Sequence, residues 1–212
     1  MLIDISFEPE AVILANGEFP KHPITTALLN NSKYLVCCDG ATNQLIDNSN
    51  RLPNAIVGDL DSLSEENKLR FSGIVYHVGE QETNDLTKSV KFCLNRGIRN
   101  IIILGATGKR EDHTIGNISL LAEYIGFEGT NICMVTDFGI FTAIKENSSF
   151  ESYAGQQVSI FNINDAQITS SNLKYPIQDR AFSNWSQGTL NESEGNIFEL
   201  KTTEKVVVFR AF

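Results

Sequence analysis

The stretch IIILGATGKREDHTIGNISLLAEY, residues 101–124, decides the fold. Its first four residues form a continuous apolar run that ends at Gly105. Residues 112–124 then form an amphipathic segment whose apolar side chains recur at helical spacing on one face, namely Ile115, Ile118, Leu121 and Ala122. A buried strand, a glycine turn and a helix, in this order, form the repeating unit of sheets with parallel strands.

The same unit recurs along the first two thirds of the chain. Further apolar runs typical of strands buried on both faces occupy residues 11–15, 34–38, 54–57, 74–78 and 132–135. A second amphipathic segment, residues 84–94, is apolar on one face, and Gly97 follows it as a stop signal. We therefore predict a mainly parallel α/β/α domain over residues 1–147.

The pattern changes near residue 148. Short alternating stretches follow, separated by serine, asparagine and glycine, at residues 157–162, 167–169, 197–200 and 206–209. This pattern indicates a small all-β domain, a sandwich or a barrel, and we favour a β-sandwich over residues 148–212. The stretch VVVF at residues 206–209 is interpreted as an edge strand that a second copy of the chain would cover.

Composition narrows the classes of function. The 212 residues are 42% hydrophobic and 20% charged, as in an ordinary globular protein, and their formal net charge is −9. This acidity argues against a nucleic-acid binder, which needs a basic face. It does not exclude ATP, because a metal ion can bridge acidic side chains to an anionic ligand.

Neither a secretory leader nor a membrane span is expected. The first residues lack a basic region, and no apolar run approaches the roughly 18 residues needed to cross a bilayer. The cysteines lack metal-ligand spacing, so we predict reduced thiols at Cys37, Cys38, Cys93 and Cys133. These features predict a cytoplasmic protein. The sequence has no G-x-S-x-G motif for a hydrolase, and His113 is predicted to be a peripheral residue.

Carboxylates follow the predicted strands. Asp39, Asp59 and Asp61 stand at strand ends, and Asp85 opens a predicted helix. Ligands of open parallel sheets bind at this edge, and Mg²⁺ prefers oxygen ligands. In an extended turn, a two-residue spacing puts Asp59 and Asp61 on the same side, where they repel unless a cation separates them. We predict a magnesium site; a turn or helix cap is the alternative for the D-x-D pair.

The loop GATGKREDH at residues 105–113 is the second candidate site. Backbone N–H groups at the start of a helix favour phosphate, and Lys109 and Arg110 can pair with its oxygens. The loop is not a Walker A motif, because two residues rather than four separate its glycines. A plain helix start with Asp112 as N-cap is compatible with phosphate binding.

The segment QETNDLTK, residues 81–88, is the third candidate site. Thr83 or Asn84 can cap a helix, which places Asp85 and Lys88 one turn apart on one face. The alternative is a capped helix that carries one surface ion pair, worth under ~1 kcal/mol.

Taken together, these motifs resemble those of thiamine pyrophosphokinases. Six motifs occur in the same order as in that family, namely CDGATN (38–43), VGDLDS (57–62), TNDLTK (83–88), LGATGKREDH (104–113), LKYP (173–176) and GTLNE (188–192). The resemblance implies an ATP-binding α/β domain followed by a β-sandwich, assembled as a homodimer. It implies transfer of pyrophosphate from ATP to the hydroxyl of thiamine, which yields thiamine diphosphate and AMP.

The resemblance also implies roles for individual side chains. The catalytic and Mg²⁺-binding residues would be Asp39, Asp59, Asp61 and Asp85. ATP and its phosphates would be bound by Gln81, Thr83, Lys88, Gly105, Thr107, Gly108, Lys109, Arg110 and Asp112. Thiamine would lie at the dimer interface against Tyr175, Thr189 and Asn191, with Trp185 as a rival aromatic. Either Asp59 or Asp85 could accept the proton of the attacking hydroxyl, and the sequence does not distinguish between them.

The chain departs from the family's usual pattern in a few places. Lys109 stands where a second glycine is usual, and Thr42 likewise replaces a glycine. Tyr175 stands where tryptophan is frequent, and Leu190 where serine is frequent. The last two differences concern thiamine contact rather than the ATP chemistry.

Two other classes of function stay open. A nucleotide-sugar transferase could use Asp59 and Asp61 as its metal pair, but residues 83–88 and 105–113 then have no role. A nonenzymatic nucleotide sensor could use the all-β domain for partners, and it would bind ATP but no thiamine. Release of AMP from ATP and thiamine separates both from the pyrophosphokinase.

Overall fold

The computed structural model describes residues 7–212, which divide into two compact units. The α/β unit comprises Phe7–Asn117 with Gly129–Asp137, and the β unit comprises Ile118–Glu128 with Phe138–Phe212. This division differs from the boundary expected near residue 148. Strand β7 (Gly139–Ile144) pairs along its whole length with β13 (Val206–Ala211), so it belongs with the C-terminal strands.

The α/β unit is built on parallel strands, as predicted. They are β1 (Ala11–Leu14), β2 (Leu35–Cys38), β3 (Ala55–Gly58), β4 (Val75–His77), β5 (Asn100–Leu104) and β6 (Asn131–Thr136). Their order is β6-β5-β1-β2-β3-β4, and every neighbouring pair is parallel. Every residue of β1, β2 and β3 is buried, which explains their continuous apolar sequences.

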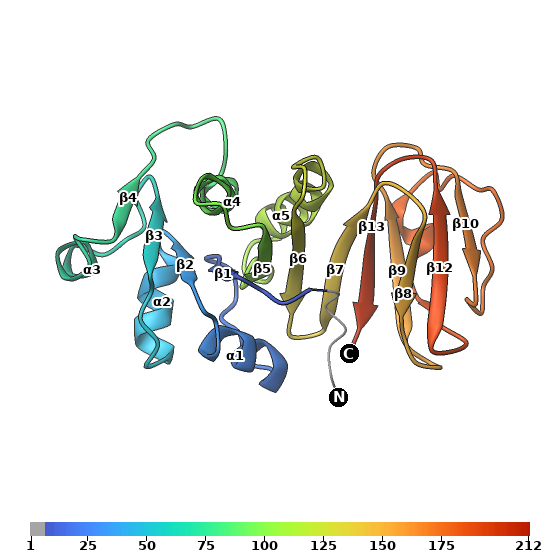
Figure 1. The fold of residues 1–212 in the computed structure, drawn as a ribbon, viewed down its shortest axis with the longest axis horizontal. Coiled ribbons are helices and arrows are strands. Elements are labelled where there is room, and N and C mark those ends of the chain that lie inside the picture. The colour runs from blue at the N-terminus through green and yellow to red at the C-terminus, as the bar shows by residue number, and fades with distance from the viewer. Residues whose placement is uncertain (1–6) are drawn as a thin grey trace. The chain divides into compact units, whose positions relative to one another are not determined.

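Helices connect these strands. They are α1 (Pro23–Asn30), α2 (Ala41–Asn48), α3 (Glu65–Arg70), α4 (Asp85–Asn95) and α5 (Glu111–Tyr124). The connections through α1 and α2 run from β1 towards β3, whereas the connection through α4 runs back from β4 to β5. Because such crossovers are right-handed, α1 and α2 lie on one face of the sheet and α4 on the other (Figure 1). Helix α4 begins where the Asn84 side chain accepts a hydrogen bond from Thr87 N (3.0 Å) and ends before Gly97, whose φ is +79°. The two predicted helices are therefore confirmed.

The direction of winding reverses at the centre of this sheet. From β1 the chain proceeds outward through β2, β3 and β4, then returns to β5 on the other side of β1. The loops after β1 and β5 therefore leave neighbouring strands at the topological switch point, where open parallel sheets bind their ligands.

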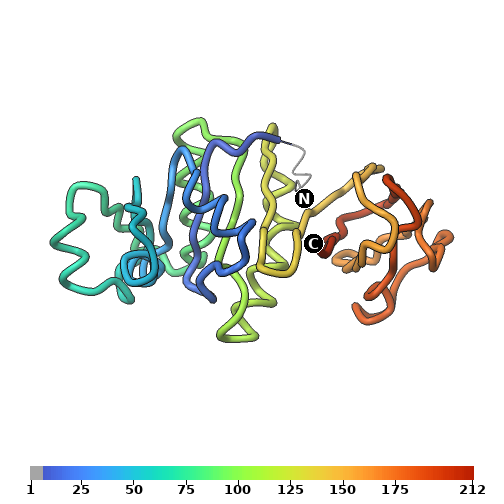
Figure 2. The backbone as a smooth tube through the Cα atoms, turned by 90° about the horizontal axis from the view of Figure 1, so that it is seen from below, coloured from blue at the N-terminus to red at the C-terminus, as the bar shows by residue number. Residues whose placement is uncertain are grey.

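The β unit is a sandwich of antiparallel strands. Besides β7 and β13 it contains β8 (Ser148–Glu151), β9 (Gln157–Asn162), β10 (Ile168–Ser171), β11 (Asn191–Glu192), β12 (Ile197–Thr202) and the 3₁₀ helix η1 (Trp185–Gly188). Within the unit, strands in the order β11-β9-β13-β7 and strands in the order β10-β12-β8 form its two layers. Val158, Ile160 and Phe198 lie in their shared core. These strands are the yellow-to-red part of the tube in Figure 2.

The prediction that residues 206–209 form an edge strand is wrong. Strand β13 pairs with β7 on one side and with β9 on the other, so both rows of its backbone hydrogen-bonding groups are used. An all-apolar run suits this position because a central strand has no edge that must be kept free of other chains.

Two expectations about composition can be compared with the structure. The four cysteines, all in the described part of the chain, are free and buried, as predicted. Over residues 7–212, no helix combines the length and the hydropathy that a membrane span requires.

Candidate active site

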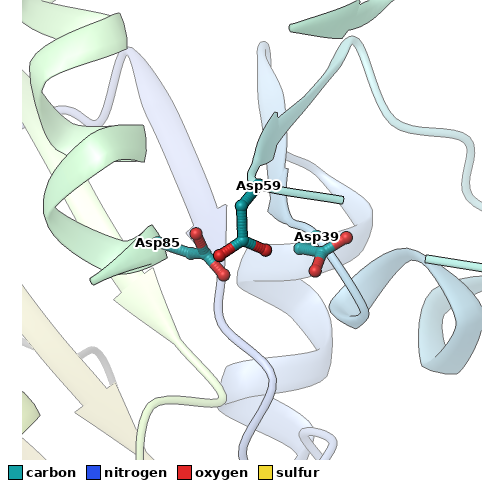
Figure 3. A group of neighbouring side chains, drawn as sticks. All are labelled: Asp39, Asp59 and Asp85. Atoms are coloured by element: carbon teal, nitrogen blue, oxygen red, sulfur yellow. The ribbon is translucent and has the colours of Figure 1, made fainter. Parts of the chain in front are cut away.

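Three carboxylates converge at the carboxyl edge of the α/β unit (Figure 3). Asp39 follows β2, Asp59 follows β3 and Asp85 is the first residue of α4, and one carboxylate oxygen of each lies within 4.8 Å of the others. A Cβ on Gly58 would lie 2.8 Å from the Asp39 Cβ and 3.1 Å from the Asp85 Cγ. Glycine at the end of β3 therefore allows these side chains, which we call the acid group, to approach one another.

Asp39 is the buried member of the acid group. Its Oδ2 accepts a hydrogen bond from Ser62 N (2.8 Å), whereas its Oδ1 is buried and has no hydrogen-bond partner. Burial raises the pKa of Asp39, and the nearby charges of Asp85 and Asp59 raise it further, against the hydrogen bond from Ser62. A buried carboxylate oxygen without a partner, beside two other carboxylates, fits a hard cation such as Mg²⁺.

Lys88 lies inside the acid group rather than on the surface. Its Nζ is 3.2 Å from Asp85 Oδ1 and 3.8 Å from Asp59 Oδ2, and its side chain is 2% exposed. The alternative of a solvated ion pair on α4 is therefore wrong. With Lys88 charged and all three carboxylates ionised, two negative charges remain, and one divalent cation would balance them.

Asp61 does not lie with the acid group. Leu60 has a φ of +70°, and the backbone N–H of Asp61 donates to Asp59 Oδ1 (3.2 Å). Asp61 is exposed, and its carboxylate is outside the group that the other acidic residues form. The prediction that an extended turn aligns Asp59 with Asp61 is wrong, because the residue between them, Leu60, has a left-handed rather than an extended conformation.

The acid group opens into a cleft of about 600 Å³. Other predicted ATP-binding residues line the same cleft, namely Gln81, Thr83, Lys88, Gly108, Lys109 and Arg110. The cleft also includes residues that the sequence did not single out as ligands, namely Asn16, Gly17, Ser62, Asn84, His113 and Asn117. Several of these carried a signal in the sequence: an Asn-Gly pair, Asn16 and Gly17, ends the first predicted strand, and Ser62, Asn84 and His113 lie within the family-like motifs. His113 was predicted to be peripheral, yet it belongs to the cleft wall.

Three predicted phosphate ligands are not among the residues that line the cleft. The carbonyl oxygens of Gly105 and Thr107 accept hydrogen bonds from Gly17 N (2.6 Å) and Glu18 N (2.8 Å), which join the loops after β1 and β5. Asp112 lies in the first turn of α5 rather than at its N-cap, and its carboxylate accepts from Arg110 Nε (3.1 Å). This Arg110 contact, together with a hydrogen bond from His113 N, lowers the pKa of Asp112 to about 2.

The predicted thiamine-binding residues of the β unit differ in what their side chains do. Tyr175 is 62% exposed, so its ring is not part of the core. Asn191 is buried: its Oδ1 accepts from Tyr175 N (3.1 Å) and its Nδ2 donates to Tyr175 O (2.7 Å). The amide of Asn191 therefore holds the backbone of Tyr175. The Thr189 hydroxyl donates to the carbonyl of Ser186 (2.8 Å).

Trp185 is anchored within the β unit. Its indole Nε1 donates to the carbonyl of Asn162 (2.8 Å), and its ring meets the ring of Phe161 edge-on at a centroid distance of 5.9 Å. Because its polar atom is used and its ring packs on β9, Trp185 is less available for a ligand than Tyr175.

Comparison with known proteins assigns this chain to a family. Residues 25–134 match the family described as "Thiamin pyrophosphokinase, catalytic domain", and residues 139–209 match "Thiamin pyrophosphokinase, substrate-binding domain". The chain belongs to the thiamin pyrophosphokinase family. The interval between the two matches coincides with the division between Asp137 and Phe138.

Curated relatives match over part of their length. Thiamin pyrophosphokinase 1 of Caenorhabditis elegans is 33% identical over 106 residues, which cover 46% of this chain and 43% of that protein. Thiamine pyrophosphokinase 1 of Oryza sativa subsp. japonica is 30% identical over 163 residues, which cover 65% of this chain and 60% of that protein. The chain spans about half the length of the curated relatives it matches.

Solved structures establish the fold. The thiamin pyrophosphokinase from Candida albicans matches with a TM-score of 0.78 at 18% identity, over 96% of this chain and 89% of that chain. The thiamine pyrophosphokinase from Bacillus subtilis matches with a TM-score of 0.76 at 21% identity, over 95% of this chain and 98% of that chain. The predicted architecture, a mainly parallel α/β domain followed by an all-β domain, is confirmed.

Proposed function

We propose that this protein is a Mg²⁺-dependent thiamine pyrophosphokinase, which transfers pyrophosphate from ATP to the hydroxyl of thiamine and releases AMP. The observation that carries the proposal is the acid group, with its unpaired Asp39 oxygen, in one cleft with Lys109 and Arg110. Such a cleft suits a polyphosphate bound through a metal ion. The match of both units to the two domains of the family supports thiamine as the acceptor.

The residues of the cleft would have different roles in the transfer. Asp39, Asp59 and Asp85 would hold Mg²⁺, which supplies neutralisation of the charge on the polyphosphate. Lys109 and Arg110 would pair with phosphate oxygens, with Arg110 exchanging Asp112 for phosphate. Phosphoryl-type transfer requires mainly positioning and charge stabilisation from a protein.

The remaining step is removal of the proton from the attacking hydroxyl of thiamine. The carboxylates of Asp59 and Asp85 are partly exposed at the cleft, so each can accept it. Asp39 is less suited to this role, because its one unpaired oxygen is buried.

The proposed function is tested by incubating the protein with radiolabelled ATP, thiamine and Mg²⁺. We expect AMP and thiamine diphosphate in equal amounts, and neither product in the presence of EDTA. Transfer to a sugar phosphate without dependence on thiamine would instead indicate a nucleotide-sugar transferase. Tight ATP binding without thiamine binding or turnover would indicate a nucleotide sensor.

The Arg110→Lys variant should use ATP poorly although it keeps the charge. The guanidinium of Arg110 already forms a two-point pair with Asp112, a geometry that a lysine ammonium cannot reproduce for phosphate. We expect KM for ATP to rise about tenfold, measured from initial rates of AMP release at saturating thiamine. Exposed Arg70, on α3, provides the control Arg70→Lys, and an unchanged KM for ATP in Arg110→Lys would show that Arg110 does not bind phosphate.

We propose that the exposed ring of Tyr175 stacks on thiamine, whose thiazolium carries a permanent positive charge. Cation–π attraction of roughly 0.5–2 kcal/mol predicts that Tyr175→Ala raises KM for thiamine roughly 2- to 30-fold and leaves KM for ATP unchanged. Tyr175→Phe keeps the ring and should behave like the wild type. A thiamine defect in Trp185→Ala but not in Tyr175→Ala would assign the stacking ring to Trp185.

Asn191 is proposed to support thiamine binding through Tyr175. Asn191→Ala removes both hydrogen bonds to the Tyr175 backbone and leaves buried groups unpaired, at a cost of about 1–3 kcal/mol in the free energy of unfolding. We expect a raised KM for thiamine and a lower midpoint of chemical unfolding. A raised KM with unchanged stability would contradict this role and favour a direct contact between the amide and thiamine.

The homodimer and the cytoplasmic location are still predictions. The central position of β13 removes the argument from an exposed edge strand, so the dimer rests on the resemblance to the family. Multi-angle light scattering at micromolar concentration should give twice the mass of the 23.5 kDa chain. A fully active species with the mass of one chain would refute the dimer.

A further inference from the structure

The residue after β1 is fixed at the topological switch point. Asn16 lies between Ala15, which continues the pairing with β5 by donating to Leu104 O (2.8 Å), and Gly17, which donates to Gly105 O (2.6 Å). A Cβ on Gly17 would lie 2.4 Å from the Thr107 carbonyl oxygen, so the chain can approach this closely only with glycine here. The backbone on both sides of Asn16 is therefore held.

The neighbours of the Asn16 amide define its orientation. Its Oδ1 accepts from Gln44 Nε2 (2.7 Å) and lies 3.4 Å from Lys109 Nζ. A lysine ammonium donates and cannot accept, so the atom that faces Lys109 must be the amide oxygen. The NH₂ group must then point to the other side.

The NH₂ group of Asn16 is an unused donor on the acidic side of the cleft. It lies so close to Gly40 that a Cβ there would be 2.6 Å from Nδ2, and Gly40 directly follows Asp39 of the acid group. Within residues 7–212, no protein acceptor pairs with Nδ2, although Asn16 lines the cleft. The single side chain of Asn16 thus reaches from Lys109 to the edge of the acid group.

We infer that Asn16 is a substrate-binding residue whose Nδ2 donates a hydrogen bond to a nonbridging phosphate oxygen of ATP. This inference rests on the proposed function. The Asn16 side chain contacts Lys109 on one side and lies next to Gly40, which follows Asp39, on the other. A polyphosphate bound by a cation at the acid group and by Lys109 would therefore lie beside Asn16. Its oxygens are strong acceptors, and a donor whose direction is set before the ligand arrives loses little freedom on binding.

Gln44 acts as a positioning residue in this arrangement. Its Nε2 donates to the Asn16 Oδ1 and also lies 3.2 Å from the carbonyl oxygen of Gly17. Together with Lys109, Gln44 favours the amide orientation in which the donor faces the cleft.

The test uses Asn16→Asp, in which the NH₂ group of the amide is replaced by a second carboxylate oxygen and the shape of the side chain hardly changes. Gln44 and Lys109 can still donate to the aspartate, but the ligand now meets an acceptor with negative charge. By isothermal titration calorimetry without thiamine, we expect Kd for Mg²⁺–ATP and for Mg²⁺–tripolyphosphate to rise about tenfold or more. Asn50→Asp adds the same charge at an exposed position outside the cleft and should change neither constant.

The outcomes separate this inference from the proposed function. If the wild type releases AMP but Asn16→Asp binds both ligands as tightly as the wild type, the inference fails and the function stands. A weaker affinity for ATP but not for tripolyphosphate would place the contact on the nucleoside and overturn the phosphate assignment. If the wild type binds neither ligand, both proposals fail. Should Asn16→Asp lose its thermal unfolding transition, Asn16→Ala, which removes the donor without adding charge, decides by the same two constants.

Discussion

The Asp59→Asn variant should lose at least about 100-fold in the rate of AMP release and keep its fold. The substitution removes one negative charge and one oxygen ligand from the acid group, where the carboxylates of Asp39 and Asp85 lie within 4.8 Å. Preorganised charge at a transferring phosphoryl group lowers the activation barrier by about 3 kcal/mol, and the loss of this stabilisation corresponds to a factor of at least about 100 in rate. Initial rates at saturating ATP, thiamine and Mg²⁺ measure it, with circular dichroism to check the fold.

Two further variants make the result specific. Asp47→Asn removes an equal charge from an exposed position of α2 and should leave the rate unchanged. Asp61→Asn should cost much less than Asp59→Asn, because the Asp61 carboxylate is exposed and outside the acid group. An equal loss in Asp61→Asn would return Asp61 to the metal site, and near-normal turnover in Asp59→Asn would refute the acid group as the catalytic centre.

The Lys88→Met variant should be destabilised by about 3 kcal/mol when no divalent cation is present. Methionine fills a similar volume but leaves Asp85 and Asp59 without their internal cation, and breaking a buried ion pair costs about 3–5 kcal/mol. Partial exposure of both carboxylates places the expected value at the lower end. Urea unfolding in EDTA, followed by circular dichroism, gives the free energy of unfolding.

Mg²⁺ should then restore much of the stability of Lys88→Met. A cation that binds the folded state adds to the free energy of unfolding in proportion to the logarithm of its concentration, and a site with one more net negative charge should bind it more tightly. Lys91→Met, at an exposed position of the same helix, is the matched control and should show neither effect. Equal stability of Lys88→Met and wild type in EDTA would mean that Lys88 is not the counter-ion of the acid group.

Much of the fold could be read from local sequence. Runs such as residues 35–38 and 101–104 are apolar throughout because both faces of a central parallel strand are covered, and the structure places each predicted strand of the α/β unit within one residue at each end. Helix α4 was predictable because its apolar face, its Asn84 cap and its Gly97 stop all agree. The shorter helices α1, α2 and α3 were not predicted, since helices of this length depend on packing against the sheet rather than on their own sequence.

In the β unit, local sequence predicts strands but not their positions in the sheet. An apolar run such as residues 206–209 suits an edge strand that a partner covers or a central strand between two others, and only the pairing partners distinguish these positions. Strand β7 is a second example. It follows β6 after a short turn in the sequence, and only the structure shows that it pairs with β13, the last strand of the chain.

By itself, the sequence determined which kinds of residue stand at the ends of the strands. Because carboxyl ends of parallel strands share one edge, Asp39, Asp59 and Asp85 could be expected together, and the motifs around them placed the chain in its family. Only the tertiary structure decided which side chains meet. Long-range packing buries Lys88 among the carboxylates, the left-handed Leu60 removes Asp61 from them, and Gln44 and Lys109, from two separate segments, orient Asn16. Spacing along the chain cannot specify contacts of this kind, because they depend on how distant segments pack in space.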